Sequence, residues 1–291
     1  MGNDDAALAR RLWQHYEPVH AVVYFAPEVA DEFASTGLKG WWSGYFAGRG
    51  APLGECPPEV IEAVFFGFAP ALVHRSLPYA WSVLTPTEAV DIRERTARAV
   101  LDRLLGPGEW MTHLERTAAL LRLAVDGAEL AGRALFAGNR ALAWPEDPLT
   151  QVWHGCTLLR EHRGDGHNAA LVAAGVDGLR ANLLAVGANV LKGSDAQRAA
   201  RGWSETEWSE AADDLVERSW LDDRVSLTPV GTGQRDEIES ATDRLALGPL
   251  RALGGRVDEL IDLLAPLVAA VVTSGTIAYP NPIGLTPPAH H

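Results

Sequence analysis

The segment WSETEWSEAADDLVERSWLDDRVSLTPVG, residues 203–231, contains the signals that decide the fold. Ser204 is followed three residues later by Glu207, which is the capping-box spacing that satisfies free backbone N–H groups where a helix begins. Trp208 and Leu215 then recur at helical spacing and predict a stripe that packs inward. We expect this helix to end near 220–221.

A short strand pair and a long helix are predicted to follow. The best strand candidate in the chain lies around 223–229, and Thr228 with Pro229 is a start signal for the next helix. Helical periodicity dominates elsewhere: TPTEAVDIRERTARAVLDRLLG (85–106) opens with Thr85 as an N-cap and closes with Gly106. The sequence therefore predicts a mainly α protein.

The order of these elements carries a resemblance to a known family. A helix, an acidic turn, the residues LTPVG and a long helix containing TDRL (242–245) resemble the recognition helix, wing and following helix of MarR-type winged-helix proteins. The stretches WWSGYFAGR and REHRGDGH are also similar to those of a group of MarR-like proteins from high-GC bacteria. The resemblance implies a winged-helix C-terminal half, 141–291, behind a helical, aromatic-rich N-terminal half, 1–140. It implies no activity.

Two segments resemble each other within the chain. FAGRGAPLGECPPEVIEAVF (46–65) and FAGNRALAWPEDPLTQVWHG (136–155) align with five identities, and each runs from a proline into an apolar helix. A true duplication would make the protein a pseudo-dimer of two related helical halves with a ligand cleft between them; chance identity is the alternative. The sequence also leaves the oligomeric state open, a homodimer included.

The charge of the chain argues against nucleic acid as a partner. The formal net charge is −13, and between 203 and 223 eight acidic residues accompany a single basic one, Arg218. In the MarR family the helix corresponding to 204–220 lies in the DNA major groove, where affinity comes from cations that neutralise phosphates. We therefore expect a scaffold that has lost DNA binding. The alternative is a ligand-responsive MarR-like transcriptional regulator, which requires basic residues to converge on one face: Arg198, Arg201, Arg224 and Arg235.

The stretch LLREHRGDGHNAALVAAG, 158–175, concentrates six titratable side chains in eight positions. One interpretation is a solvated turn at Gly164 and Gly166, with surface histidines and a capping residue for the next helix. The other is a polar site set against the core. In that case acid–base catalysis would fall to four residues and anion binding to two arginines. The predicted catalytic residues are Glu161, His162, Asp165 and His167, and the arginines are Arg160 and Arg163.

No cofactor is specified by the sequence. His162, Asp165 and His167 are of types that bind zinc or iron, but their spacing matches no metal signature. A CxxCH haem motif is also missing. The metal, the cofactor and the question whether the protein is an enzyme are left open.

Aromatic residues cluster in the N-terminal half, in HAVVYFAPEV (20–29) and GWWSGYFAGR (40–49). Such clusters usually pack in a core, but Trp and Tyr also line ligand pockets. Our first hypothesis is a protein that binds an aromatic or planar small molecule between its two halves. A stronger version of this hypothesis is that the protein also converts the molecule chemically. The predicted ligand-binding residues are His20, Tyr24, Trp41, Trp42, Tyr45, Arg49, His154, Arg160 and Arg163. A further alternative is a module whose acidic helix docks a basic protein.

The remaining features predict a cytoplasmic protein with no membrane partner. Cys56 and Cys156 are too few for a disulfide framework, and the first residues contain no long apolar run. The most apolar segment, 263–272, is too short to span a bilayer and contains Pro266.

Overall fold

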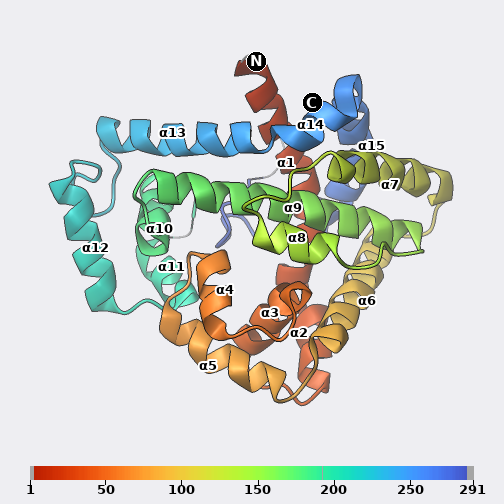
Figure 1. Ribbon diagram of the computed structural model, residues 1–291, viewed down its shortest axis with the longest axis horizontal. Helices are drawn as coiled ribbons and strands as arrows, with labels where there is room; N and C mark the ends of the chain where they lie inside the picture. Colours follow the sequence, from red (N-terminus) through yellow and green to blue (C-terminus); the bar gives the residue numbers. More distant parts are fainter. Residues whose placement is uncertain (1–2, 192, 287–291) are drawn as a thin grey trace.

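The computed structural model describes residues 3–191 and 193–286, and within these ranges the protein is built from α-helices (Figure 1). The first eight are α1 (Asn3–Phe25), α2 (Pro27–Ser35), α3 (Trp41–Gly50), α4 (Pro58–Phe65), α5 (Pro70–Trp81), α6 (Pro86–Leu105), α7 (Met111–Asp126) and α8 (Ala134–Arg140). The others are α9 (Pro148–Ala173), α10 (Gly178–Gly187), α11 (Ser194–Arg201), α12 (Glu205–Glu217), α13 (Pro229–Leu245), α14 (Leu247–Leu253) and α15 (Val257–Thr273).

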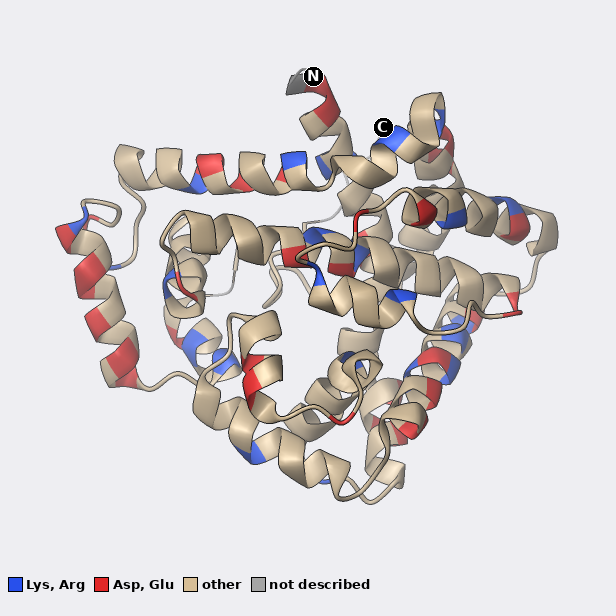
Figure 2. Ribbon diagram, in the orientation of Figure 1, with Lys and Arg blue, Asp and Glu red and all other residues tan. Residues whose placement is uncertain are grey.

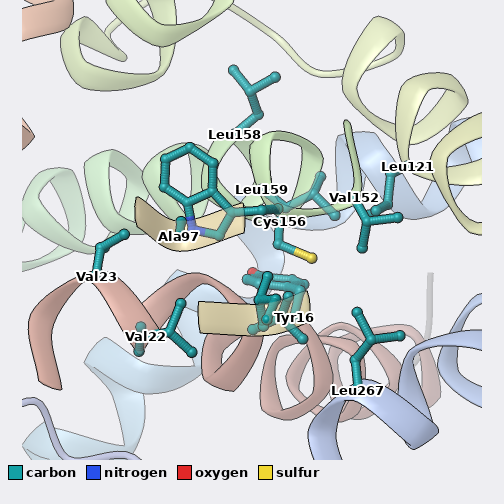
Figure 3. Close-up of a cluster of buried hydrophobic side chains, with 14 of the residues drawn as sticks. Tyr16, Val22, Val23, Ala97, Leu121, Val152, Cys156, Leu158, Leu159 and Leu267 are labelled. Carbon is teal, nitrogen blue, oxygen red and sulfur yellow. The ribbon is translucent and has the colours of Figure 1, made fainter. Parts of the chain in front are cut away.

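The longest helix, α9, runs through the middle of the molecule and packs against α1, α6, α7, α8 and α13 (Figure 1). Its apolar side chains join those of α1, α6, α7 and α15 in the largest core cluster, part of which is drawn in Figure 3. Trp153 of α9 is fully buried at the centre of this cluster. Residues from both sides of the predicted boundary at 140–141 take part, and the division into two domains stays a prediction.

Two smaller apolar clusters accompany the main core. One unites α3, α4 and α5 around Phe46, Phe65 and Phe68. The other unites the end of α9 with α10, α12 and α13 around Trp208 and Leu215. The segment 178–245 therefore has a core of its own, which is joined to the rest of the protein through α9 and through the packing of α13 on α1.

Three of the predicted helix starts are confirmed. Thr85 and Glu88 form a capping box at α6, Ser204 and Glu207 form one at α12, and the Thr228 hydroxyl accepts a hydrogen bond from a backbone N–H at the start of α13. The predicted end of the helix at 220–221 is wrong by a few residues, because α12 ends at Glu217. Within the described residues the predicted strand at 223–229 is reduced to one antiparallel bridge, between Leu221 and Leu227.

The interpretation that places a turn at Gly164 and Gly166 is wrong, because α9 continues through both residues without a break. Gly166 serves another purpose: a Cβ atom there would lie 2.7 Å from Nη1 of Arg133, so the missing side chain makes room for that arginine. The interpretation of His162 as a surface residue is also wrong, since only 1% of it is exposed. The polar stretch is set against the core.

Two glycines of α13 provide a test of the packing against the 218–228 loop. A Cβ atom at Gly231 would lie 2.0 Å from the carbonyl oxygen of Trp220, whereas one at Gly233 meets nothing within 4 Å. Gly231→Ala is expected to lower the free energy of unfolding by about 1–3 kcal/mol because backbone must shift. Gly233→Ala, the control, should raise it by about 0.5–1 kcal/mol. Urea titrations followed by circular dichroism measure both; equal effects would contradict the close contact.

Within the described ranges, no single helix has both the length and the apolar character that crossing a bilayer requires. α9 and α10 satisfy the criterion only when taken together, and they bend by 98° where they meet.

Candidate functional site

A cavity of about 240 Å³ lies between the end of α1, α2, α3 and one turn of α6. Most of its wall is apolar, and the glycines 44 and 48 of α3 leave part of it without side chains. The aromatic and polar residues that line it are His20, Tyr24, Asp31, Phe33, Trp41, Tyr45, Arg49 and Arg93. Five of the predicted ligand-binding residues thus meet around one cavity. All the lining residues come from the 1–140 half, whereas we expected a site between the two halves.

Three aromatic rings form one side of this cavity. The Trp41 and Tyr45 rings are stacked, with centroids 5.3 Å apart and an interplanar angle of 17°, and the Tyr24 ring lies 5.4 Å from that of Tyr45. Trp41 is 47% exposed, so it forms the solvent side of the wall. Trp42, the sixth predicted member of this group, points elsewhere: it packs against Phe68 in the α3–α5 cluster.

A buried hydrogen-bond chain leads to the cavity from α9. Nδ1 of His20 lies 2.9 Å from the hydroxyl of Thr157, and Nε2 lies 2.7 Å from the hydroxyl of Tyr24. Burial, reinforced by the nearby Arg160 guanidinium, holds the pKa of His20 well below its ordinary value, so the ring is neutral. The chain fixes the Tyr24 hydroxyl, and with it one polar atom of the cavity wall.

Arg49 is held by a carboxylate behind the cavity wall. Its Nε and Nη2 atoms donate to the two oxygens of Glu161 at 3.0 and 3.1 Å, a bidentate pair, and its guanidinium lies over the Phe65 ring. Arg160 donates to the same carboxylate at 2.7 Å. Burial alone would raise the pKa of Glu161, but Arg160 and Arg49 hold it below its usual value. Glu161 is therefore a fixed anion, an arrangement suited to positioning Arg49 and unsuited to proton transfer.

Arg93 of α6 also lines the cavity and was not predicted. It is only 3% exposed, and its Nη2 atom donates to Oδ1 of Asn139 at 2.9 Å. One signal in the sequence pointed to it. The buried stripe of α6 includes Ala89, Ile92 and Thr96, and position 93 places an arginine within that stripe. An arginine on the inward face of an amphipathic helix is unusual enough to mark a site.

The structure does not bring the four predicted catalytic residues together. Glu161 faces α3, whereas His162 packs on Phe136 with its Nε2 atom 3.4 Å from Glu129. Asp165 accepts a hydrogen bond from the backbone N–H of Phe136 and so caps α8; Nδ1 of His167 lies 2.9 Å from the hydroxyl of Thr242 on α13. Glu161, His162 and His167 point in different directions because successive residues of a helix are turned by about 100°. Asp165 lies one turn after Glu161 and reaches a different neighbour, α8.

The remaining predicted ligand-binding residues lie apart from the cavity. His154 packs on Trp144 near α6. Arg160, Arg163 and His167 line a separate cleft of about 380 Å³ between α1, α9 and α13. Its basic groups are matched by acids: Arg163 pairs with Asp243 at 2.7 Å, and Arg160 with Glu17 at 3.5 Å.

The described part of the chain contains no group of three or more His, Cys, Asp or Glu side chains placed to hold a metal ion. The three residues considered for zinc or iron, His162, Asp165 and His167, are turned toward different neighbours.

The buried histidines predict a pH dependence of stability. Burial is the main cause that lowers the pKa of His154 to about 3 and of His162 to about 4, and it also lowers those of His20 and His167. The unfolded chain takes up these protons near pH 6.5, before the folded protein does. The free energy of unfolding should therefore fall as the pH drops from about 6.5 toward 4.

Buried carboxyl groups act in the opposite direction. Burial raises the pKa of Asp165 to about 6 and also raises those of Glu17 and Glu94, so the folded protein takes up these protons more readily than the unfolded chain, and acid stabilises the fold through these groups. The four histidines, together with the lowered pKa of Glu161, are expected to outweigh them. Urea titrations between pH 7 and 4.5 measure the trend, and His162→Asn should reduce the slope. A constant free energy of unfolding over this range would contradict the prediction.

The segment 194–245 is a second structural feature of interest. α11 and α12 are joined by a short turn in which Gly202 adopts a φ of 78°, and the 218–228 loop then leads into α13. Figure 2 shows acidic residues along α12, on the outer edge of the molecule. Two helices linked by a tight turn that contains a glycine, beside a separate core, form the arrangement of a helix-turn-helix protein.

Comparison with known families agrees with this class. The sequence model described as a helix-turn-helix family matches residues 9–278, so the chain belongs to that family. No curated protein and no solved structure matches it.

Proposed function

We propose that the protein is a cytoplasmic helix-turn-helix family member that binds an aromatic or planar small molecule in the cavity between α1, α2, α3 and α6. The observation that carries this proposal is the cavity itself, with stacked aromatic rings on one side and two buried arginines in its wall. An apolar cavity of about 150 Å³ binds benzene in another protein, so about 240 Å³ offers room for one or two rings.

The proposal assigns binding, and no catalytic step, to this site. The polar groups of the cavity are held by partners behind it: Tyr24 by His20, and Arg49 by Glu161. Such a wall is preorganised, which favours affinity because little conformational freedom is lost on binding.

In this proposal the C-terminal part is a winged-helix unit that has lost DNA binding. The order of α12, the Leu221–Leu227 bridge and α13 is consistent with a short wing of MarR type. Exposed acidic residues on α12, among them Glu205, Glu210 and Glu217, would repel phosphates.

The four arginines required for a DNA-binding face are engaged within the protein. Arg224 pairs with Asp213 at 2.5 Å and Arg235 with Glu239 at 3.3 Å. Arg198 lies 3.6 Å from Asp195, and Arg201 is packed over Phe68.

The test of ligand binding uses 2-naphthol, a neutral two-ring probe, and isothermal titration calorimetry. We expect saturable binding to the wild type and weaker binding to Trp41→Ala, which removes one ring of the stacked wall. Trp220→Ala is the matched control, because Trp220 packs against the α10–α12 cluster and is remote from the cavity lining. Equal loss in both variants, or no binding of planar aromatic probes to the wild type, would overturn the proposal.

A ligand-responsive MarR-like regulator is the second candidate, because a helix-turn-helix family includes this chain. A mobility-shift assay with duplex DNA at low salt separates the two candidates. We expect no shifted band at micromolar protein. A band that weakens steeply with added salt would favour the regulator.

A further inference from the structure

The charge around the cavity is unbalanced at Arg93. Its side chain is nine-tenths or more buried, yet its hydrogen-bond partner is the neutral amide of Asn139, and its guanidinium lies 5.3 Å from the centre of the Trp153 ring. Its Nε atom has no hydrogen-bond partner among the described residues. Glu94 and Glu161 lie close enough to raise the pKa of Arg93 without hydrogen-bonding to it, while burial lowers that pKa overall.

The other charged groups of the cavity wall do not correct this imbalance. Arg49 is buried as well, and its carboxylate, Glu161, is shared with Arg160. Asp31, the lining carboxylate on α2, is exposed. Within the described residues, the cavity is thus lined by two buried guanidinium groups and by no buried carboxylate.

We infer that the ligand is an anion, an aromatic carboxylic acid in its ionised form, and that Arg93 binds its carboxylate. This inference rests on the proposed function and adds the chemical class of the ligand to it. A buried guanidinium without an acid partner is costly, and a ligand carboxylate would supply the missing counter-charge. The planar fork of an arginine also matches the two oxygens of a carboxylate.

The rest of the wall suits the same ligand. The stacked rings of Trp41 and Tyr45 are suited to an aromatic body. The Tyr24 hydroxyl, held by His20, adds a polar contact beside it. Arg49 is already bonded through Nε and Nη2 to Glu161, so of the two lining arginines Arg93 is the one whose hydrogen-bond partner is not a carboxylate.

The test compares three probes of nearly the same shape on the full-length protein by calorimetry: 2-naphthoate, 2-naphthamide and 2-naphthyltrimethylammonium. We expect 2-naphthoate to bind about tenfold or more tightly than the neutral amide, because a charge-assisted hydrogen bond is replaced by a neutral one. The cationic probe should not bind measurably. This comparison needs no variant and is therefore independent of any folding defect.

Arg93→Met assigns the preference to one residue. It should reduce the ratio between 2-naphthoate and 2-naphthamide to about one, whereas Arg98→Met, at an exposed arginine of the same helix, should leave the wild-type ratio unchanged. Circular dichroism verifies that each variant is folded before it is titrated.

The outcomes separate the two claims. If 2-naphthamide binds as tightly as 2-naphthoate to the wild type, the inference of an anionic ligand is overturned while the cavity remains a site for planar molecules. If a folded Arg93→Met variant keeps the full preference, the assignment to Arg93 is overturned. If none of the three probes binds, both the inference and the proposed function fail.

Discussion

Replacing Glu161 with glutamine is expected to lower the free energy of unfolding by about 3–5 kcal/mol, the cost of breaking a buried ion pair by removing one partner. Glu161 is fully buried and accepts hydrogen bonds from both Arg49 and Arg160. The neutral amide fits the same space but leaves the two guanidinium groups without their shared counter-charge. Urea titrations followed by circular dichroism measure the loss.

The same substitution at Glu237, an exposed residue of α13, is the matched control and should change the free energy of unfolding by less than about 0.5 kcal/mol. The double variant Glu161→Gln with Arg49→Met should lose less than the sum of the two single variants, because the second change removes one of the stranded charges. Strict additivity would show that the pair is not coupled and would refute the role assigned to it.

Trp153→Ala is expected to cost about 3–5 kcal/mol of the free energy of unfolding, as large-to-small changes of a buried tryptophan do. Trp153 is fully buried in the main core, its ring is stacked on His20, and its Nε1 atom donates to the carbonyl oxygen of His20 at 3.3 Å. Trp153→Phe should lose less, because a ring still fills part of the space. Thermal and urea unfolding measure both variants.

Trp41→Ala is the control for this prediction, because the same atoms are removed from a side chain that is 47% exposed. It should cost less than about 1 kcal/mol while weakening the binding of planar probes. A loss for Trp41→Ala as large as that for Trp153→Ala would mean that the stacked wall is a structural core and that the cavity is incidental.

The local parts of the fold could be predicted from sequence because their signals are local. The capping boxes at Ser204 and Thr85 determine where α12 and α6 begin through side chains three residues apart. The turn at Gly164 and Gly166 was predicted wrongly by the same kind of reasoning. Glycine and charge usually mark a surface turn, but here Gly166 makes room for Arg133, a residue 33 positions earlier in the chain. No local pattern contains that information.

The candidate site was predicted in part for a similar reason. The aromatic and cationic character of His20, Tyr24, Tyr45 and Arg49 predicts a ligand site, and the contact between the Tyr24 and Tyr45 rings brings the end of α1 and α3 to one cavity. The helix α9 has neighbours on several faces, so its titratable residues separate: Asp165 caps α8, whereas Glu161 anchors Arg49. Residue type left open whether these groups lie in a solvated turn or against the core, and only the tertiary arrangement determines which partner each one has.

The pairing of α1 with α15 has a consequence for how the protein is made. Leu12 of α1 and Leu264 of α15 belong to one core cluster, so α1 is covered by a helix that is synthesised much later. Until α15 is synthesised, the apolar side of α1 lacks part of its native cover. Contacts between segments so far apart in the sequence form slowly, and apolar surface stays exposed until they have formed. Nascent chains halted before 257 should therefore depend on chaperones more than chains halted after 273.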